Sequence, residues 1–181
     1  MRKAHTILGA VAVASIAGAA SADISITFEN FIAAGAQFEM LGDENGDVLS
    51  GSIENAVGDF IMNTAGEDFT WCDDLTVMIA NDDLSDLYMQ IGGYSDFGAA
   101  YRFTWPTGAS GDAGTVGGGI AIEGESIDVS GYRLWLGNGY ASGGNGDWSG
   151  AIDLGGISFV PAPGALALLG LAGVSARRRR N

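Results

Sequence analysis

The residues from 23 to 160 form short apolar or aromatic segments separated by clusters of Gly, Asp, Asn and Ser, without a helical period. Residues 24–28 and 100–105 alternate apolar and polar positions, as strands with one buried face do. Residues 69–80 are the strongest candidate for a core strand, because their second half is nearly all apolar. The other segments with a strand pattern are residues 38–41, 52–62, 87–91, 119–123, 126–129, 132–136 and 148–160.

Short strands at this spacing predict an all-β fold, in the form of an antiparallel β-sandwich or jelly roll. The 30 glycines fit the hairpin turns of such a fold, and they also fit a flexible low-complexity chain. Aromatic residues spaced along the segment favour the folded alternative, because each brings a large apolar surface to bury. We therefore expect one β-sandwich domain over residues 23–160, which is long enough to enclose a core.

Three segments of this domain share the strand rhythm of a known family. Residues 74–79 read Asp-Leu-Thr-Val-Met-Ile, residues 132–138 read Tyr-Arg-Leu-Trp-Leu-Gly-Asn, and residues 146–152 read Gly-Asp-Trp-Ser-Gly-Ala-Ile. Over residues 70–159 the chain resembles the P domains of proprotein convertases, although the Ser-Pro-x-Gly turn of that family is missing here. The resemblance implies a jelly-roll sandwich that stabilises or binds and does not catalyse.

The first 22 residues have the pattern of a secretory signal peptide. A basic Arg-Lys pair follows the initial Met, residues 7–20 are apolar, and Ala20 and Ala22 supply the small residues of a cleavage site. We expect a helical signal segment over residues 1–22, cleaved between Ala22 and Asp23. A retained membrane anchor is the alternative.

The final residues of the sequence combine a proline-rich turn, an apolar run and a block of arginines. Residues 164–176 are uncharged and would measure about 20 Å as a helix, which is short against a hydrocarbon core of roughly 30 Å. The arginines favour the cytoplasmic side of a membrane, and the prolines keep the preceding chain extended. We expect a short apolar C-terminal helix used for sorting; a buried helix followed by a basic tail is the alternative. The residues expected to carry the sorting signal are Pro161, Ala162, Pro163, Arg177, Arg178, Arg179 and Arg180.

This order of features resembles the C-terminal signal of PEP-CTERM proteins, which are exported bacterial proteins handled by exosortases. The resemblance covers residues 161–181, and the usual Pro-Glu-Pro reads Pro-Ala-Pro here. It implies export through the secretion machinery and a transient anchor in the inner membrane. Sorting by an exosortase-like enzyme to the cell surface or the extracellular matrix would follow.

The charges are divided between the two ends and the middle of the chain. Residues 23–160 contain all 22 acidic residues but only Arg102 and Arg133 as basic ones, so two positive and 22 negative charges give a formal charge of −20. The only His and the only Lys fall within the first 22 residues. Their absence from the domain excludes Ser-His-Asp catalysis, His-bound zinc and Lys-based phosphate binding. The negative charge also makes nucleic acid an unsuitable partner. Calcium binding and glycosidase-type acid–base pairs remain.

Cys72 is the only cysteine of the sequence, so it forms no disulfide within the chain. The simplest interpretation is a small buried apolar residue beside Trp71. A disulfide to another molecule or a reactive thiol is the alternative.

Two acidic clusters have the spacing of calcium ligands. Asp43, Asn45 and Asp47 occupy alternate positions, as oxygen ligands do at the start of many calcium loops. An EF-hand is excluded, because the glycine stands before the third ligand and no closing Glu follows at the right distance. A solvated Asx turn is the alternative for this loop. The second cluster consists of Asp82, Asp83 and Asp86. We expect no required cofactor, with calcium as the candidate ion.

Aromatic and acidic side chains together could also bind carbohydrate. Tyr94, Tyr140 and Trp148 lie in or beside glycine-rich loops, and they are therefore the candidates for exposed ligand contacts. Aromatic residues in alternating strands more often belong to the core. No pair of carboxylates stands out as catalytic among the 22 acidic residues.

These patterns predict an exported, surface- or matrix-associated structural or adhesive protein without catalytic activity. A carbohydrate- or calcium-dependent binding module is the second hypothesis, with an extracellular polysaccharide as its partner. A glycosidase that uses only carboxylates is a remote third. An exposed face shared by the candidate aromatics and acidic oxygens would favour the binding module.

Overall fold

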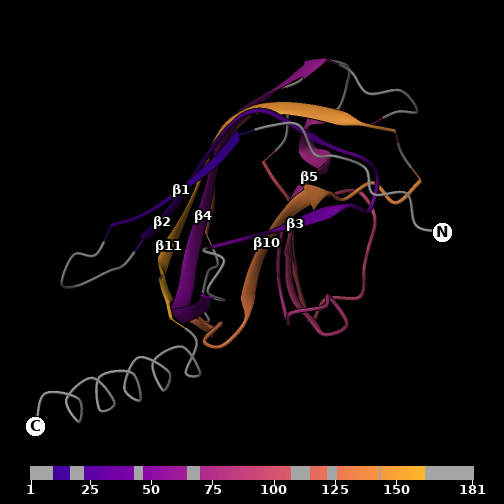
Figure 1. Ribbon diagram of the computed structural model, residues 1–181. Coiled ribbons are helices and arrows are strands. Elements are labelled where there is room, and N and C mark those ends of the chain that lie inside the picture. Colours follow the sequence, from indigo (N-terminus) through magenta and orange to yellow (C-terminus); the bar gives the residue numbers. More distant parts are fainter. Residues whose placement is uncertain are drawn as a thin grey trace, which may run out of the picture.

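Two β-sheets pack face to face around one shared core (Figure 1). The computed structural model describes residues 10–16, 23–42, 47–64, 70–106, 115–121, 126–142 and 144–161. Strands make up most of these residues, and their only helical segment is the single 3-10 turn η2 (Cys72–Asp74). The predicted all-β fold with two sheets is therefore confirmed.

The first sheet contains the longest strands. Its order is β1 (Ala10–Ile16), β2 (Asp23–Ala33), β11 (Gly146–Val160), β4 (Val48–Thr64) and β8 (Thr115–Ala121), with the short β9 (Ile127–Asp128) also paired to β4. Every neighbouring pair is antiparallel. The last strand of the sandwich thus lies between β2 and β4, in the middle of the sheet.

The second sheet is shorter and carries one parallel pair. Its order is β3 (Phe38–Leu41), β10 (Arg133–Asn138), β5 (Leu75–Ala80), β6 (Leu87–Ile91) and β7 (Tyr101–Phe103). β7 runs parallel to β6, because the loop of residues 92–100 returns the chain to the start of β6 before β7 begins. The expectation of an entirely antiparallel sandwich is wrong at this pair.

The core lies between the two sheets and is built from the alternating apolar positions of their strands. Ile24, Ile26 and Phe28 of β2 face it from the first sheet, and Leu75, Val77 and Ile79 of β5 face it from the second. The other face of β5 is also covered, because Met78 and Ala80 form a small second cluster with Trp135. Burial on both faces explains why β5 is a continuous apolar run.

The N-terminal segment differs from the expected signal helix. Residues 10–16 are a strand, β1, that adds to the edge of β2 with Ala10 opposite Glu29 and Ile16 opposite Asp23. The backbone groups along the edge of β2 give this apolar segment a pairing partner that an isolated helix would lack. Residues 1–9 and 17–22, with Ala20 and Ala22, lie outside the described residues.

The C-terminal prediction concerns residues that are almost entirely outside the described part. β11 ends at Val160 and Pro161 follows it in an exposed position, while residues 162–181 are not described. Within the described ranges, none of the helices combines the length and the apolar character that crossing a bilayer requires. The short apolar helix therefore stays a prediction.

Candidate binding site

Buried polar side chains gather at one end of the second sheet, where β5 begins and where β6 and β10 end. Within the described residues, the buried polar or charged side chains are Thr70, Asp74, Thr76, Gln90 and Asn138. Contacts join them: the Thr76 hydroxyl donates to the Asp74 carbonyl at 2.9 Å, and Thr70 and Asn138 both donate to the Gly144 carbonyl at 3.2 Å. Buried polar groups need hydrogen-bond partners. A cluster of buried polar side chains therefore distinguishes this end of the sheet from the apolar core.

Asp74 is the charged residue of this group and is only 1% exposed. Its Oδ2 accepts the backbone N–H of Trp71 at 2.7 Å, and its Oδ1 accepts the backbone N–H of Tyr94 at 3.0 Å. Burial raises the pKa of Asp74 to about 6; the two N–H donors oppose this shift, and the neighbouring charge of Asp73 adds to it. The carboxylate therefore ties the turn before β5 to the loop after β6.

The side chain of Gln90 anchors the loop after β6 through hydrogen bonds. Its Nε2 donates to the carbonyls of Gly92 and Ser95 at 2.9 and 2.8 Å, and its Oε1 accepts the backbone N–H of Phe97 at 3.3 Å. One buried side chain thus fixes three points of an irregular segment. Because a loop with satisfied backbone groups has fewer alternative conformations, its exposed residues are held in place.

Asn138 does the same for the loop after β10. Its Oδ1 accepts the backbone N–H of Tyr140 at 2.9 Å, and its Nδ2 donates to the carbonyl of Ala33 at 3.2 Å as well as to that of Gly144. The side chain therefore anchors Tyr140 to the end of β2.

Direct hydrogen bonds also join the two loops. The N–H of Ser95 donates to the Gly139 carbonyl at 2.9 Å, and the Ser95 hydroxyl accepts the N–H of Ala141 at 2.9 Å. Gly93 and Gly139 approach so closely that a Cβ at Gly93 would lie 3.0 Å from the Cα of Gly139. The two glycines let the loops lie against each other.

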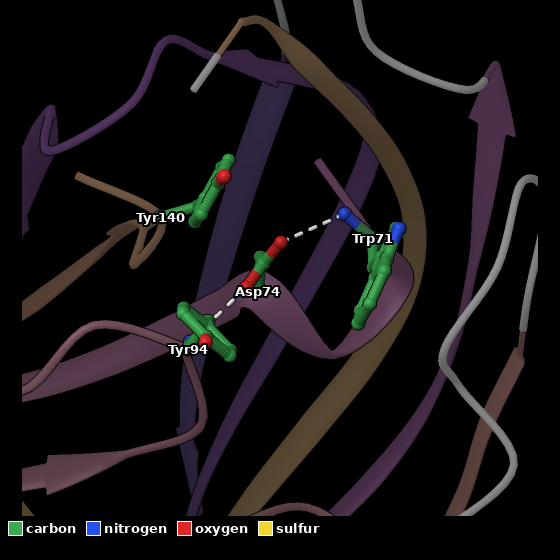
Figure 2. A pocket seen from close by; sticks show the side chains of 4 residues that line it. All are labelled: Trp71, Asp74, Tyr94 and Tyr140. Carbon is green, nitrogen blue, oxygen red and sulfur yellow. Dashed lines mark hydrogen bonds between the residues drawn. The ribbon is translucent and has the colours of Figure 1, made fainter. Parts of the chain in front are cut away.

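A hollow of about 230 Å³ opens above this polar floor, lined by Trp71, Asp74, Tyr94 and Tyr140 (Figure 2). Asp74 lies between the three aromatic residues, which come from three separate loops. Tyr94 is 69% exposed, and its ring meets that of Tyr140 edge to face with centroids 5.8 Å apart. The hollow is therefore aromatic on its walls and acidic at its base.

A second hollow of about 290 Å³ shares Trp71, Asp74 and Tyr94 with the first. Asp73 and Arg102 are among its other lining residues. Oδ1 of Asp73 is buried without a hydrogen-bond partner, and burial raises the pKa of this carboxyl. Arg102 donates to the Tyr94 carbonyl at 2.8 Å, which supports the Tyr94 loop from this side. The two hollows therefore adjoin at Trp71, Asp74 and Tyr94.

Of the three aromatic residues predicted to contact a ligand, the structure brings two together at this site. Tyr94 and Tyr140 line the first hollow, beside the carboxylate of Asp74. Trp148 is fully buried, and its Nε1 donates to the Cys72 carbonyl at 3.0 Å, so its exposure was wrongly predicted. The indole lies over Gly146, the first residue of β11, where a Cβ would collide with the ring.

Cys72 lies in the same part of the core as Trp148. The side chain is fully buried, and burial raises the pKa of its thiol to about 12. Because the thiolate is the reactive form, Cys72 is inert in the folded protein.

The cluster of Asp82, Asp83 and Asp86 forms a hydrogen-bonded turn. Asp82 makes an ion pair with Arg133 at 2.5 Å, and Oδ1 of Asp83 accepts the backbone N–H of Ser85 at 3.1 Å. The N–H of Asp86 donates to the side chain of Asn81 at 3.1 Å. The carboxylates of Asp82 and Asp83 thus have partners within the protein, whereas Asp86 joins the turn through its backbone.

The other predicted calcium loop lies only partly within the described residues. Asp47 is half-buried ahead of β4, whereas Asp43 and Asn45 lie outside the described residues. In the part of the chain that the structure describes, no three His, Cys, Asp or Glu side chains are grouped as metal ligands would be. Calcium at residues 43–47 stays a prediction.

The sequence did not single out four residues as part of the site: Trp71, Asp74, Gln90 and Asn138. Gln90 interrupts the apolar end of the segment 87–91, and Asn138 follows a run of apolar residues. Such a polar residue at a strand end is a readable signal of a buried anchor. Trp71 gives no comparable signal, because its position depends on the 3-10 turn before β5.

No known protein family matches the chain. Comparisons with curated proteins and with solved structures likewise find no match.

Proposed function

We propose that the protein is an exported, non-catalytic adhesive module that binds saccharide chains in the hollow between Trp71, Tyr94 and Tyr140. One observation carries the proposal: three partly exposed aromatic side chains from separate loops surround a carboxylate on a floor of buried hydrogen bonds. Tyr94 is the one strongly exposed aromatic side chain among the described residues, whereas Trp71 and Tyr140 are half-buried.

The chemistry of such a hollow suits a sugar ring. An aromatic face carries partial negative charge, which attracts the polarised C–H groups on the apolar face of a pyranose. The hydroxyl groups of Tyr94 and Tyr140 can exchange hydrogen bonds with those of a sugar, while the buried carboxylate of Asp74 holds the backbone beneath them. A neutral polysaccharide fits better than an acidic one, since carboxylates of the site would repel further negative charge.

The rigidity of the site supports binding without a conformational change. Asp74, Gln90 and Asn138 fix the backbone beneath the aromatic residues before any ligand arrives. A preorganised site spends less free energy on ordering its own groups. This arrangement is typical of a binding surface.

Export and sorting complete the proposal. The pattern of residues 1–22 supports a cleaved signal peptide. The pattern of residues 161–181 supports a PEP-CTERM-like signal with a short apolar helix, read by an exosortase-like enzyme after a transient stay in the inner membrane. The destination would be the cell surface or the extracellular matrix, where a polysaccharide ligand is available, and the domain would be a jelly roll.

A carboxylate-only glycosidase is the second candidate, and one observation favours it. Asp73 and Asp74 both line the second hollow, and burial raises the pKa of both. Raised carboxyl pKa values are typical of acid catalysts. Asp74, however, uses both of its oxygens to hold backbone N–H groups, which is an anchoring role. Release of reducing ends from a bound polysaccharide, abolished by Asp73→Asn, would establish hydrolysis.

A glycan array tests the proposal directly. The protein is screened with and without calcium, and the best neutral glycan is then titrated against variants. Tyr94→Ala and Tyr140→Ala should each weaken binding at least tenfold, whereas Tyr94→Phe keeps the ring and should bind nearly as well as the wild type. Met40→Ala is the control, because Met40 is also a large exposed side chain, 45% accessible, but belongs to β3. Equal binding by all four variants contradicts the proposal.

A further inference from the structure

The edge of β2 is covered by a segment that the proposed export would remove. β1 (Ala10–Ile16) pairs along β2 from Asp23 to Glu29, and the expected cleavage after Ala22 separates the two strands. This step rests on the proposed export. The processed protein then presents the backbone N–H and C=O groups of that edge to solvent, and such an edge is a template for another strand.

β1 shows which kind of strand can pair with the edge of β2. β1 is an uncharged, seven-residue antiparallel strand with the sequence Ala-Val-Ala-Val-Ala-Ser-Ile. At the opposite edge of the same sheet, β8 is also an uncharged strand of seven residues, Thr-Val-Gly-Gly-Gly-Ile-Ala. Both lack proline and charge, which are the usual protections of an edge strand.

The strand directions allow β8 of one copy to replace β1 of the next. In the order β2, β11, β4 and β8 every neighbouring pair is antiparallel, so β8 runs opposite to β2. When a second copy is placed beside the first in the same orientation, its β2 is antiparallel to the first copy's β8. The buried faces, marked by Ile24 in β2 and Val116 in β8, then stay on one side of a continuous sheet.

Charge favours this pairing over the pairing of two β2 strands. β2 carries Asp23 and Glu29 on its exposed face, and two such strands would bring carboxylates together. Like charges on neighbouring strands are destabilising. β8 brings none, so the contact between β2 and β8 avoids this repulsion.

We propose that removal of residues 1–22 opens the edge of β2 to β8 of a second copy, so that processed molecules join head to tail through one continuous sheet. The contact uses different surfaces on the two partners, and it therefore leaves a free β2 at one end and a free β8 at the other. Such a chain grows without closing, in contrast to a symmetric dimer.

Sedimentation of the processed protein tests the assembly. The full sequence is expressed with its own leader in a bacterial host, and mass spectrometry reads the N-terminus of the purified product. We expect Asp23 as the first residue and species larger than a monomer that grow with protein concentration at 150 mM salt, a condition of roughly 8 Å screening length. A processed monomer at every concentration overturns the assembly and leaves export intact, whereas a product that begins at Met1 overturns both.

A charge on β8 provides the matched variant. Gly119→Glu places a carboxylate on the exposed face of β8, opposite Val57 of β4, and should weaken assembly by roughly threefold to fivefold. Ala100→Glu adds the same charge at an exposed position ahead of β7 and should leave assembly unchanged. Equal weakening by both variants overturns the assignment to β8.

Cross-linking identifies the strands even if the charged variant folds poorly. Ser25→Cys in β2 and Gly117→Cys in β8 are prepared separately, mixed after processing and treated with a short thiol cross-linker. Dimers that contain one copy of each variant are expected. Products formed only between two Ser25→Cys molecules overturn the proposed pairing. The wild type is the control, because its buried Cys72 should not react.

Discussion

The carboxylate of Asp74 accepts the backbone N–H of Tyr94 at 3.0 Å, although twenty residues of chain separate them. Asp74 is buried, whereas Tyr94 is one of the most exposed large side chains of the described residues. An exposed aromatic ring is thus positioned by a charge beneath it.

Asp74→Ala should destabilise the domain and release the loop of Tyr94. The change leaves the N–H groups of Trp71 and Tyr94 without their acceptor, which costs about 1–3 kcal/mol of unfolding free energy for each buried donor. Urea titration measures the loss, and hydrogen exchange at the Tyr94 amide measures the release. Asp128→Ala is the control, because it removes an exposed carboxylate that accepts the N–H of Ser130 at 2.9 Å. Similar losses from both variants would contradict a special role for Asp74.

Stability should increase as the pH falls from 7 to 5. The folded state raises the pKa of Asp74 to about 6 from an unfolded value near 3.8, so the folded protein binds the proton more tightly. The stabilisation is complete below the unfolded pKa and is lost as the pH rises through the folded pKa; the raised pKa of Asp73 acts in the same direction. Thermal melts across this range provide the measurement.

Asp74→Asn separates this effect from the general relief of charge repulsion on acidification. The variant should show a shallower slope of melting temperature against pH than the wild type. Asp153→Asn removes one charge from an exposed position of β11 and is the matched control. A slope that changes equally in both variants would assign the pH dependence to net charge alone.

Gly92→Ala should be strongly destabilising, while Gly98→Ala should be mild. Both glycines have positive φ, +84° and +82°, where an L side chain is strained. A Cβ at Gly92 would collide with the Trp105 indole and the Leu75 carbonyl, which are joined by a 2.7 Å hydrogen bond, whereas Gly98 has open space around it. We expect a loss of about 3 kcal/mol or more at Gly92 and about 1 kcal/mol at Gly98. Equal losses in denaturant titrations would show that backbone strain alone decides both cases.

Calcium should raise the melting temperature more than sodium at the same ionic strength. Residues 23–160 carry two positive and 22 negative formal charges, so any salt relieves repulsion in the folded state. The additional effect of calcium is expected from the oxygen-rich loop of residues 43–47, and Asp47→Asn should remove it. Asp83→Asn in the hydrogen-bonded turn is the control. Matched curves in the two salts would rule out a calcium site.

Replacement of Arg177, Arg178, Arg179 and Arg180 by Glu should misdirect the precursor without changing the fold of the domain. The apolar run before them is short for a bilayer, so in the proposed sorting its retention would depend on positive charge at the cytoplasmic end. Pro161→Ala with Pro163→Ala should leave the precursor in the membrane but unprocessed. Mass spectrometry of the protein released from cells is the measurement. Released protein that still carries the four arginines would contradict sorting by cleavage.

The strand pattern was largely readable from the sequence because burial alternates with the backbone. Residues 38–41 and 87–91 are strands at the predicted positions, and residues 148–160 belong to one strand that begins two residues earlier. The parallel pairing of β7 was not readable, since no local pattern records which way a short strand lies against its neighbour. β1 was likewise hidden, because an apolar segment suits a helix and a sheet edge equally well.

The sequence predicted only part of the binding site, for a related reason. Tyr94 and Tyr140 stand in glycine-rich loops, which are exposed in most folds, and the sequence indicated both. Trp148 also stands beside a glycine-rich loop, yet the register of β11 buries it. Trp71 falls in the segment predicted as a core strand, yet it is partly exposed beside a 3-10 turn. Pairing register and turn geometry depend on distant residues.

The central position of β11 also governs when the protein can fold. β2 and β4 are not neighbours in their sheet, because β11 lies between them and pairs with both. During synthesis β2 and β4 cannot complete their sheet until residues 146–160 have been made. Contacts between segments so far apart in the sequence also form slowly. A chain with this topology stays unfolded until nearly all of it has been made, which is the state that a secretion channel requires of its substrate. The strand order therefore delays folding until nearly all of the chain has been made, which would suit the proposed export.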